Sequence, residues 1–228
     1  PQPAAADLVP MKPGELQTLM IPTITRDGKP VTVMKDGWPG PPESYTAYGL
    51  DWANASNTPF REYKHWVHEG GISTPLVVHW PKGINSKGEF RSEPSHLIDI
   101  MATCVDVAGG NYPTTYNDQA ITPMEGRSLI PTFANQDLNK EAIYWEHEGN
   151  RAVRMGKWKL ISKADKQDSF IWDKTDNLES SDWELFDMEN DRTEMHDLAS
   201  ENTKLVAKMA DMWLAWGKRT GIVPRPKQ

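Results

Sequence analysis

The sequence has little of what anchors several classes of protein. A single cysteine, Cys104, stands among 228 residues, which excludes an internal disulfide and a zinc site built from several cysteines. No apolar run approaches the length of about 18 residues that a membrane-spanning helix needs. Basic residues are outnumbered by acidic ones, 25 to 32, so the positive field that attracts nucleic-acid phosphates is not expected. We therefore expect neither nucleic acid nor a membrane as a partner.

Large aliphatic side chains are scarce as well. Leu, Ile, Val and Phe account for 42 of the 228 residues, about 18%, slightly below the level of roughly 20% under which disorder becomes a concern. The sequence compensates with 10 Trp, 10 Met and 6 Tyr, and its net charge of −7 is too small to keep the chain open by repulsion. These numbers predict a folded chain with an aromatic-rich core.

Proline is concentrated at the start of the chain, where 10 of the 18 prolines fall within residues 1–62. Because proline blocks helices and removes backbone donors, this stretch is expected to run mostly as ordered loop. One hairpin is predicted within it, turning at Asp27-Gly28 between the β-rich runs 20–25 and 30–34. The role of residues 1–42 stays open.

The middle of the chain predicts a strand followed by a helix. Residues 74–80 form a short apolar run of the kind buried on both faces of an α/β sheet. Ser95 is a candidate N-cap, and Gly109-Gly110 ends the helix. Its apolar stripe, expected to be buried, consists of Leu97, Ile100, Met101, Cys104, Val105 and Ala108. Cys104 is therefore interpreted as a small core residue and not as a reactive thiol.

The last part of the chain changes to short strands at 142–146, 151–154, 157–161 and 183–186, which predicts an antiparallel sheet. Met155-Gly156 is expected to form a two-residue hairpin loop. A final helix ends before Gly221 and Pro224, and residues 162–181 are expected to be a solvated excursion between strands. The helix should lay one apolar face on the sheet: Leu205, Val206, Met209, Met212, Trp213 and Trp216.

The densest polar cluster, residues 61–71, comes directly before the predicted buried strand. Loops at strand ends build the sites of open α/β sheets, and Gly70-Gly71 lets the backbone turn sharply or approach a ligand. His65, His68 and Glu69 raise the possibility of zinc. The glycines and the loop-like surroundings do not suit a helical zinc motif, so we assign no metal ligand to this chain.

The chain as a whole resembles the C-terminal part of a type I, formylglycine-dependent sulfatase of the arylsulfatase kind. The most specific motif is Lys-x-x-x-x-Glu-Gly-Gly over residues 64–71, and the Gly-Lys-Trp-Lys hairpin at 156–159 is moderately specific. The matching segments are 48–49, 52–54, 57–71, 74–81, 96–99, 126–129, 151–160, 183–187 and 190–194.

This resemblance implies an alkaline-phosphatase-like α/β fold. Residues 1–138 would be the C-terminal part of the large domain, with a Pro-rich loop at 1–62, a site loop at 63–73 and the strand and helix at 74–110. Residues 139–228 would form a small subdomain of antiparallel strands plus a terminal helix. The resemblance also implies that Lys64 contacts the sulfate group, where an ammonium stabilises developing negative charge. The alternative is a surface lysine paired with Glu62 or Glu69.

Departures from the family pattern bear on activity. The family's nucleophile lies in a Cys/Ser-x-Pro-x-Arg motif. The stretch ending in Pro59 and Arg61 does not supply it, because Asn57 stands where the nucleophile would be and Ser56 is one residue out of register. The resemblance implies that the formylglycine, the calcium ligands and the missing N-terminal portion lie upstream. These residues would then bind no cofactor, and the isolated chain is expected to be inactive.

The first hypothesis is thus a sulfuric ester hydrolase whose C-terminal portion contributes Lys64, acting on an aryl sulfate or a sulfated glycan. The alternative is a stand-alone, non-catalytic module that binds sulfated glycans. A third possibility is a fragment that persists by dimerising through exposed strand edges. The residues indicate no compartment; family habit is periplasmic or secreted.

Overall fold

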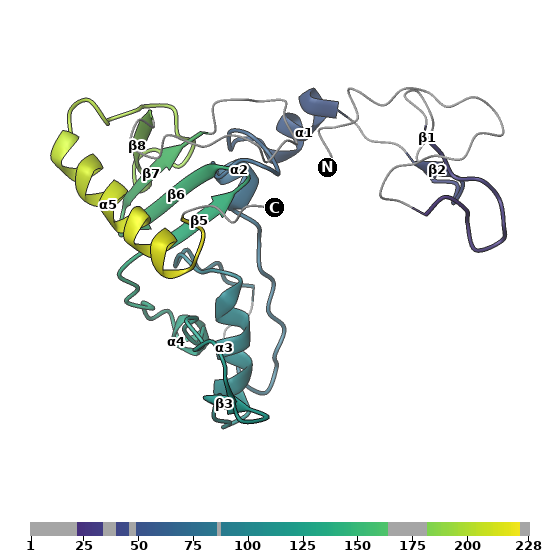
Figure 1. Ribbon diagram of the computed structural model, residues 1–228, viewed down its shortest axis with the longest axis horizontal. Coiled ribbons are helices and arrows are strands. Elements are labelled where there is room, and N and C mark those ends of the chain that lie inside the picture. The colour runs from purple at the N-terminus through teal and green to yellow at the C-terminus, as the bar shows by residue number, and fades with distance from the viewer. Residues whose placement is uncertain (1–21, 34–39, 46–48, 86–87, 164–181, 224–228) are drawn as a thin grey trace. The chain divides into compact units, whose positions relative to one another are not determined.

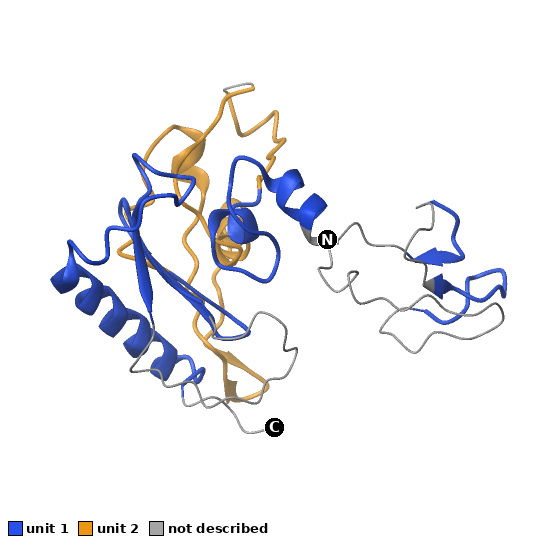
Figure 2. Cartoon of the chain, turned by 90° about the horizontal axis from the view of Figure 1, so that it is seen from above, with its two compact units in different colours: residues 1–74, 144–228 blue, residues 75–143 orange. Residues whose placement is uncertain are grey.

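The computed structural model describes residues 22–33, 40–45, 49–85, 88–163 and 182–223 (Figure 1). Two compact units make up the chain: residues 1–74 together with 144–228, and residues 75–143 (Figure 2). The domain boundary expected from the sequence, between residues 138 and 139, refers to the complete enzyme and stays a prediction. Most of the excursion at 162–181, the first 21 residues and Pro224 lie outside the described residues.

The first unit is built on a four-stranded sheet in the order β5 (Ile143–His147), β6 (Asn150–Met155), β7 (Trp158–Ser162) and β8 (Trp183–Asp187). β6 pairs antiparallel with β7, and β7 with β8, which confirms the strands predicted from the sequence. The hairpin loop differs by one residue. Met155 still pairs with Trp158, so the turn is Gly156-Lys157, with Gly156 in the left-handed region at φ 56°.

The two faces of this sheet carry different partners because side chains alternate along each strand. Val153, Leu160 and Leu185 are cross-strand neighbours on one face and are all buried. Helix α5 (Thr203–Arg219) covers this face with Met209 and Trp213 (Figure 1). The predicted terminal helix is therefore confirmed, and it ends at a left-handed Gly221, φ 77°.

The opposite face of the sheet receives residues from the polar segment that precedes the middle of the chain. Ala152, Ile161 and Phe186 pack there in one cluster with Val67, and Ile72 lies against it. Short helix α2 (Glu69–Ile72) follows directly on this contact. Residues 61–72 are thus held against the sheet on the face that α5 does not cover.

The described residues of the N-terminal part form small elements only. The predicted hairpin is limited to a turn at residues 25–29, in which Thr25 N donates to Lys29 O at 2.8 Å, and a single bridge joins Ile24 to Pro30. Beyond it, β1 (Thr32–Val33) pairs in parallel with β2 (Ser44–Tyr45). Helix α1 (Gly49–Asn57) interrupts the stretch expected to be loop, and its Ala53 packs on Tyr63 and Trp66.

The second unit contains helix α3 (Ile98–Val107), a hairpin of β3 (Thr115–Tyr116) and β4 (Gln119–Ala120), and short helix α4 (Ile130–Phe133). Its organising group is the fully buried Asp99. The Asp99 carboxylate accepts the backbone N–H of His96 at 2.7 Å and of Arg127 at 2.9 Å, and it pairs with Lys140. No helix in the described part of the chain is both long and apolar enough to cross a membrane.

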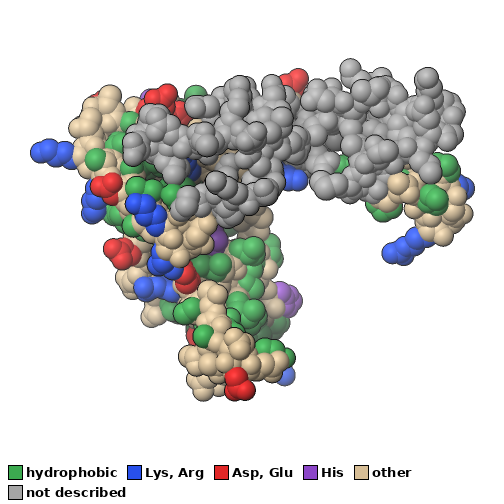
Figure 3. Space-filling view, in the orientation of Figure 1, with side chains coloured by type: hydrophobic (Ala, Val, Ile, Leu, Met, Phe, Trp, Pro, Cys, Tyr) green, Lys and Arg blue, Asp and Glu red, His purple; other side chains and the backbone are tan. Residues whose placement is uncertain are grey.

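Three predictions for the middle of the chain are wrong. Residues 74–80 are extended but join no described sheet, and Val77 is 88% exposed. The helix begins at Ile98, and Ser95 does not cap it. Its apolar stripe, including Leu97 and Cys104, is exposed, while Asp99 and Ala102 are buried. Hydrophobic side chains gather over α3 in the space-filling view (Figure 3), because the described chain supplies nothing to cover them.

The end of β8 yields a prediction about acid stability. Lys157 Nζ donates to Asp187 Oδ2 at 2.7 Å. This hydrogen bond is the largest of the causes that lower the pKa of Asp187 from 3.8 to about 2; hydrogen bonds from Asn190 and from the Glu189 backbone add to it. A carboxyl whose pKa is depressed on folding stabilises the protein above its unfolded pKa, and this contribution is lost as the pH falls through the folded value. In Lys157→Ala, the loss in unfolding free energy should be largest near neutral pH and shrink as the pH falls from 3.8 to about 2.

Urea unfolding across this pH range measures the effect, with Lys208→Ala, an exposed lysine of α5, as the matched control. If the unfolding free energies of Lys157→Ala and the parent chain differ by the same amount at every pH, Lys157 does not lower the pKa of Asp187.

Candidate functional site

Lys64 is exposed at the tip of a turn whose neighbouring residues are buried. Tyr63, Trp66 and Val67 lie in the interior, so the backbone on both sides of Lys64 is fixed by packing. Neither proposed pairing of this lysine is present: Glu62 pairs with Lys163 at 2.8 Å, and Glu69 pairs with Lys159 at 2.8 Å. Among the described residues, Lys64 has no hydrogen bond or ion pair, and its ammonium is available to a ligand.

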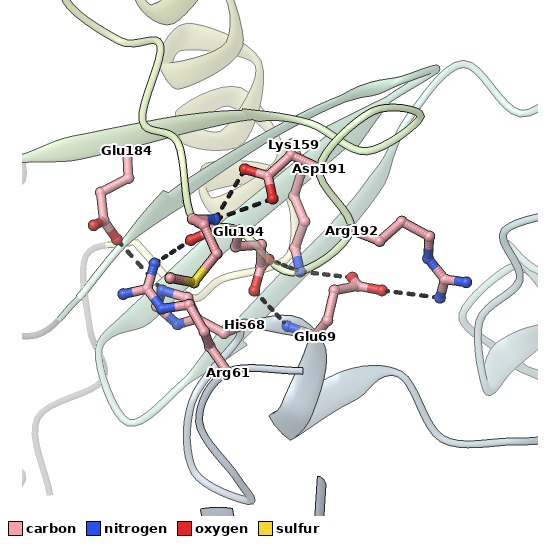
Figure 4. A network of polar contacts seen from close by, with 9 residues as sticks. Arg61, His68, Glu69, Lys159, Glu184, Asp191, Arg192 and Glu194 are labelled. Carbon is pink, nitrogen blue, oxygen red and sulfur yellow. Dashed lines mark hydrogen bonds and ion pairs between the residues drawn. The ribbon is translucent and has the colours of Figure 1, made fainter. Parts of the chain in front are cut away.

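The segment that carries Lys64 is tied to the sheet by a buried lysine. Lys159 of β7 is fully buried, and its Nζ lies 2.8 Å from Glu69 Oε1 and 2.7 Å from Glu194 Oε1 (Figure 4). Glu194 is also fully buried and accepts the backbone N–H of Glu69 at 2.9 Å. One ammonium and two carboxylates therefore join the segment 61–72, strand β7 and the loop after β8.

Two arginines complete this network. Arg192 Nη2 lies 3.5 Å from Glu69 Oε2, and Arg61 donates to the backbone carbonyl of Glu194 (Figure 4). Burial raises the pKa of Glu69, but Lys159, Arg154 and Arg192 outweigh burial, and the pKa is lowered overall. The carboxylate is consequently ionised at neutral pH, as an ion pair with Lys159 requires.

His68 forms a second contact between this segment and the sheet. Its ring is fully buried, and Nε2 donates to Glu184 Oε2 of β8 at 3.3 Å. The hydrogen bond from His68 lowers the pKa of Glu184 and outweighs the opposing effect of burial. His68 is thus occupied as a structural donor facing the sheet.

The Gly-Gly pair is required by close backbone packing. A Cβ atom on Gly70 would lie 2.2 Å from the carbonyl oxygens of Arg61 and Glu62, and one on Gly71 would lie 2.0 Å from the carbonyl oxygen of Trp66. Both distances are far inside van der Waals contact. The glycines therefore allow the turn that carries Lys64 to fold back on α2. The close approach at these glycines is to backbone atoms of the same chain and not to a ligand.

The zinc grouping weighed from the sequence is not brought together. His68 faces Glu184 and Glu69 faces Lys159, so only His65 of the three remains available. The structure instead places His65 beside His147 and Glu148, with one ligand atom of each within 4.8 Å of the others. Sequence analysis did not single out His147 or Glu148, because 82 and 83 residues separate them from His65 and no spacing motif links them.

Comparison with known proteins identifies the class of this chain. A model of the family described as N-sulphoglucosamine sulphohydrolase, C-terminal, matches residues 61–215. The match covers more than half of the sequence, so the chain belongs to this family and is a C-terminal part of a sulfatase.

Curated relatives agree with this assignment. An uncharacterized sulfatase of Schizosaccharomyces pombe is 26% identical over 187 residues, covering 80% of this chain and 32% of the relative. A sulfatase of Formosa agariphila is 25% identical over 194 residues, covering 76% and 34%. The match thus spans about a third of the length of these two relatives.

The crystal structure of Ps i-CgsB is similar in fold as well as in sequence. It superposes with a TM-score of 0.56 at 28% identity, over 74% of this chain and 34% of that protein. This confirms the fold class expected from the sequence, an α/β sulfatase fold with a small antiparallel sheet and a terminal helix.

The anchoring role of Lys159 and Glu194 was missed by sequence analysis, although both lie in segments that carry the resemblance. For Lys159 a signal existed: strand alternation places it on the same face as Ile161, where a lysine must find a buried partner. Glu194 lies in a loop without periodicity, so no pattern indicated that it would be buried.

Removing the central cation should destabilise this unit strongly. Lys159→Met keeps the aliphatic length but leaves the carboxylates of Glu69 and Glu194 buried without their partner. We expect a loss of about 3–5 kcal/mol in unfolding free energy, the usual cost of breaking a buried pair. Urea unfolding measures it, with Lys208→Met on α5 as the control; a loss comparable to that control would contradict the assigned role.

A second prediction concerns the glycine turn. Gly71→Ala places a Cβ against the carbonyl oxygens of Trp66 and Tyr63, at 2.0 and 2.7 Å, so the backbone must shift. Thermal unfolding should show that the unfolding free energy falls by about 1–3 kcal/mol, the usual cost of overpacking. Gly110→Ala is the control, because its nearest atom would be Val105 O at 3.6 Å. If Gly71→Ala and Gly110→Ala lower the unfolding free energy equally, the close backbone contacts at Gly71 do not constrain the turn.

Proposed function

We propose that this chain is the C-terminal portion of a sulfate-ester hydrolase in which Lys64 contacts the sulfate group of the substrate. The observation that carries the proposal is the state of Lys64, an exposed ammonium without a partner among the described residues, held by buried neighbours within the matched family segment. A lysine that only served solubility would not need a turn fixed from both sides.

The chemistry of the ammonium suits this role. Cleavage of a sulfate ester spreads negative charge over the oxygens of the transferring group, and a positioned cation stabilises that charge without reorganising. Lys64 Nζ can donate up to three hydrogen bonds to such oxygens. The network around Lys159 fixes the segment 61–72 on the sheet, so the proposed contact rests on a rigid support.

The nucleophile and the metal ligands of the reaction are proposed to lie outside this chain. Calcium, which the family resemblance implies, prefers six to eight oxygen ligands. Within the described residues, the one group of His, Cys, Asp and Glu side chains close enough to hold a metal offers two imidazoles and a single carboxylate. This set does not fit calcium.

The exposed apolar surface of the second unit supports a missing N-terminal portion as the partner. Residues 75–80 belong to no strand among the described residues, Val77 is 88% exposed, and Leu97, the residue before α3, is 77% exposed. Apolar surface of this kind marks a contact that the folded protein normally buries. Since the chain covers about a third of its relatives, we infer that the remainder of the sulfatase covers this surface and pairs with the extended segment.

A sulfated glycan is the substrate class that the solved relative favours. Ps i-CgsB, which resembles this chain in fold, was also crystallised in complex with k-i-k-neocarrahexaose, an oligosaccharide. An aryl sulfate remains a suitable reporter substrate, because the proposed contact of Lys64 is to the sulfate group that both classes share.

The second candidate is a non-catalytic module that binds sulfated glycans. The same exposed Lys64 favours it, since sulfate binding needs no nucleophile. It explains the uncovered apolar surface less well, because a stand-alone module would have to bury that surface in another way.

The hydrolysis of a chromogenic aryl sulfate tests the proposal. The isolated 228-residue chain should show no turnover with calcium present. The complete sulfatase polypeptide that contains this chain should turn over, and Lys64→Ala should lower kcat by about 10²–10³-fold, the effect of losing one donor to a developing anion. Lys208→Ala in the same polypeptide should leave kcat unchanged.

The possible outcomes separate the hypotheses. Turnover by the isolated chain that disappears in Lys64→Ala would mean that the nucleophile lies within these residues. A complete polypeptide that binds sulfated oligosaccharides through Lys64 without hydrolysing aryl or glycan sulfates would favour the binding module.

A further inference from the structure

Three metal-ligating side chains converge at one end of the sheet without being used by the network around Lys159. His65 follows Lys64 in the turn, His147 ends β5, and Glu148 begins the turn between β5 and β6. One ligand atom of each lies within 4.8 Å of the others. His65 Nδ1 pairs with Glu148 Oε2, and the rings of His65 and His147 meet edge to face at 5.7 Å between centroids.

The backbones that carry these side chains are clamped together. Asn150 is fully buried, and its Nδ2 donates to the carbonyl oxygens of His65 at 3.2 Å and of His147 at 3.0 Å. Glu146 Oε1 accepts the N–H of Gly149 at 2.9 Å, which closes the turn that contains Glu148. The convergence is therefore built into the fold from buried contacts and is not a chance meeting of surface side chains.

Two of the three residues adopt a backbone conformation that side chains usually avoid. His65 has φ 103° and Glu148 has φ 52°, both in the left-handed region. For Glu148 the value belongs, with Gly149 at φ 89°, to the two-residue loop between β5 and β6, whose turn requires positive φ at both positions. For His65 such a conformation costs about 1–3 kcal/mol and persists only where the surroundings enforce it. The His65 imidazole and the Glu148 carboxylate meet at this place, and their side chains are 25% and 23% exposed.

The donor set decides which ion fits. Two imidazole nitrogens and one carboxylate oxygen form the three-ligand set that zinc uses when a fourth position stays open to water. Tetrahedral coordination would place the ligand atoms about 3.4 Å from one another. The widest pair, within 4.8 Å, would close by up to about 1.4 Å, while His65 Nδ1 and Glu148 Oε2, now in direct contact, would move apart by side-chain rotation. Calcium and magnesium, which prefer oxygen ligands, are disfavoured by the imidazoles.

We propose that His65, His147 and Glu148 bind a divalent zinc ion with one open coordination position. The ion replaces the direct contact between His65 and Glu148 and links the turn that carries Lys64 to the end of β5. This site uses only residues of this chain and does not depend on the proposed sulfatase activity.

Titration of the metal-free 228-residue chain with Zn²⁺ by calorimetry, and with Co²⁺ by visible absorption, tests the proposal. One ion should bind per chain, with the intense absorption bands of tetrahedral Co²⁺. His147→Ala and Glu148→Gln should each weaken binding by at least about tenfold, which corresponds to 1.4 kcal/mol. His196→Ala is the matched control, because that exposed imidazole pairs with Asp191 at 3.5 Å outside the cluster.

Near-ultraviolet circular dichroism shows whether the variants keep the fold, and His147→Gln replaces His147→Ala if the alanine variant loses it. Absence of a one-to-one binding event would overturn the proposal. It would equally be overturned if folded His147 and Glu148 variants bind as tightly as the parent chain, or if His196→Ala abolishes binding.

Discussion

The position of residues 61–72 depends on an ammonium group held out of water between two carboxylates. Lys159 supplies the cation from the middle of β7, Glu69 comes from the segment itself, and Glu194 comes from the loop after β8. Such an arrangement is unfavourable to assemble piecemeal, since each charge loses its hydration. Once all three are present, the ion pairs and the hydrogen bond from Glu69 N fix the segment on the sheet. Everything proposed for Lys64 and His65 presupposes this anchor.

The two units differ in what they bury, and the difference follows from what the described chain contains. In the first, both faces of the sheet are covered, by α5 on one side and by the segment around Val67 on the other. In the second, a carboxylate, Asp99, is buried while the apolar residues of α3 face outward. We propose that a partner surface outside this chain covers these apolar residues. It agrees with a chain that spans about a third of its sulfatase relatives.

Local patterns predicted the elements whose partners lie within the chain. The strands at the end of the chain and helix α5 were predicted closely because these elements bury one another. Their apolar residues therefore recur every two residues in the strands and every 3.6 residues in the helix, as the sequence shows. The same reasoning failed for residues 74–80 and for the stripe on α3. Apolar periodicity says that a face will be covered, but not whether the covering residues belong to the same chain.

The candidate site was predicted only in part, for a related reason. Lys64 was proposed from a motif of contiguous residues, which a single sequence displays, and its role stays a prediction. Lys159, Glu194, His147 and Glu148 reach the segment 61–72 through the pairing of strands and the path of loops, and sequence separation hides such contacts. A lysine on the inward face of a strand was the one visible sign, since burial of a charge demands a partner.

Native-state hydrogen exchange at the backbone N–H of Glu69 tests the anchoring role of the Lys159 network most directly. This amide donates to Glu194 Oε2, so it reports whether the segment stays attached to the sheet. The account predicts that Glu69 exchanges only with the unfolding of the sheet, as slowly as the amide of Leu160 in the centre of β7. Rapid exchange at Glu69 while Leu160 stays protected would show that the segment detaches on its own, and that Lys159 does not hold it.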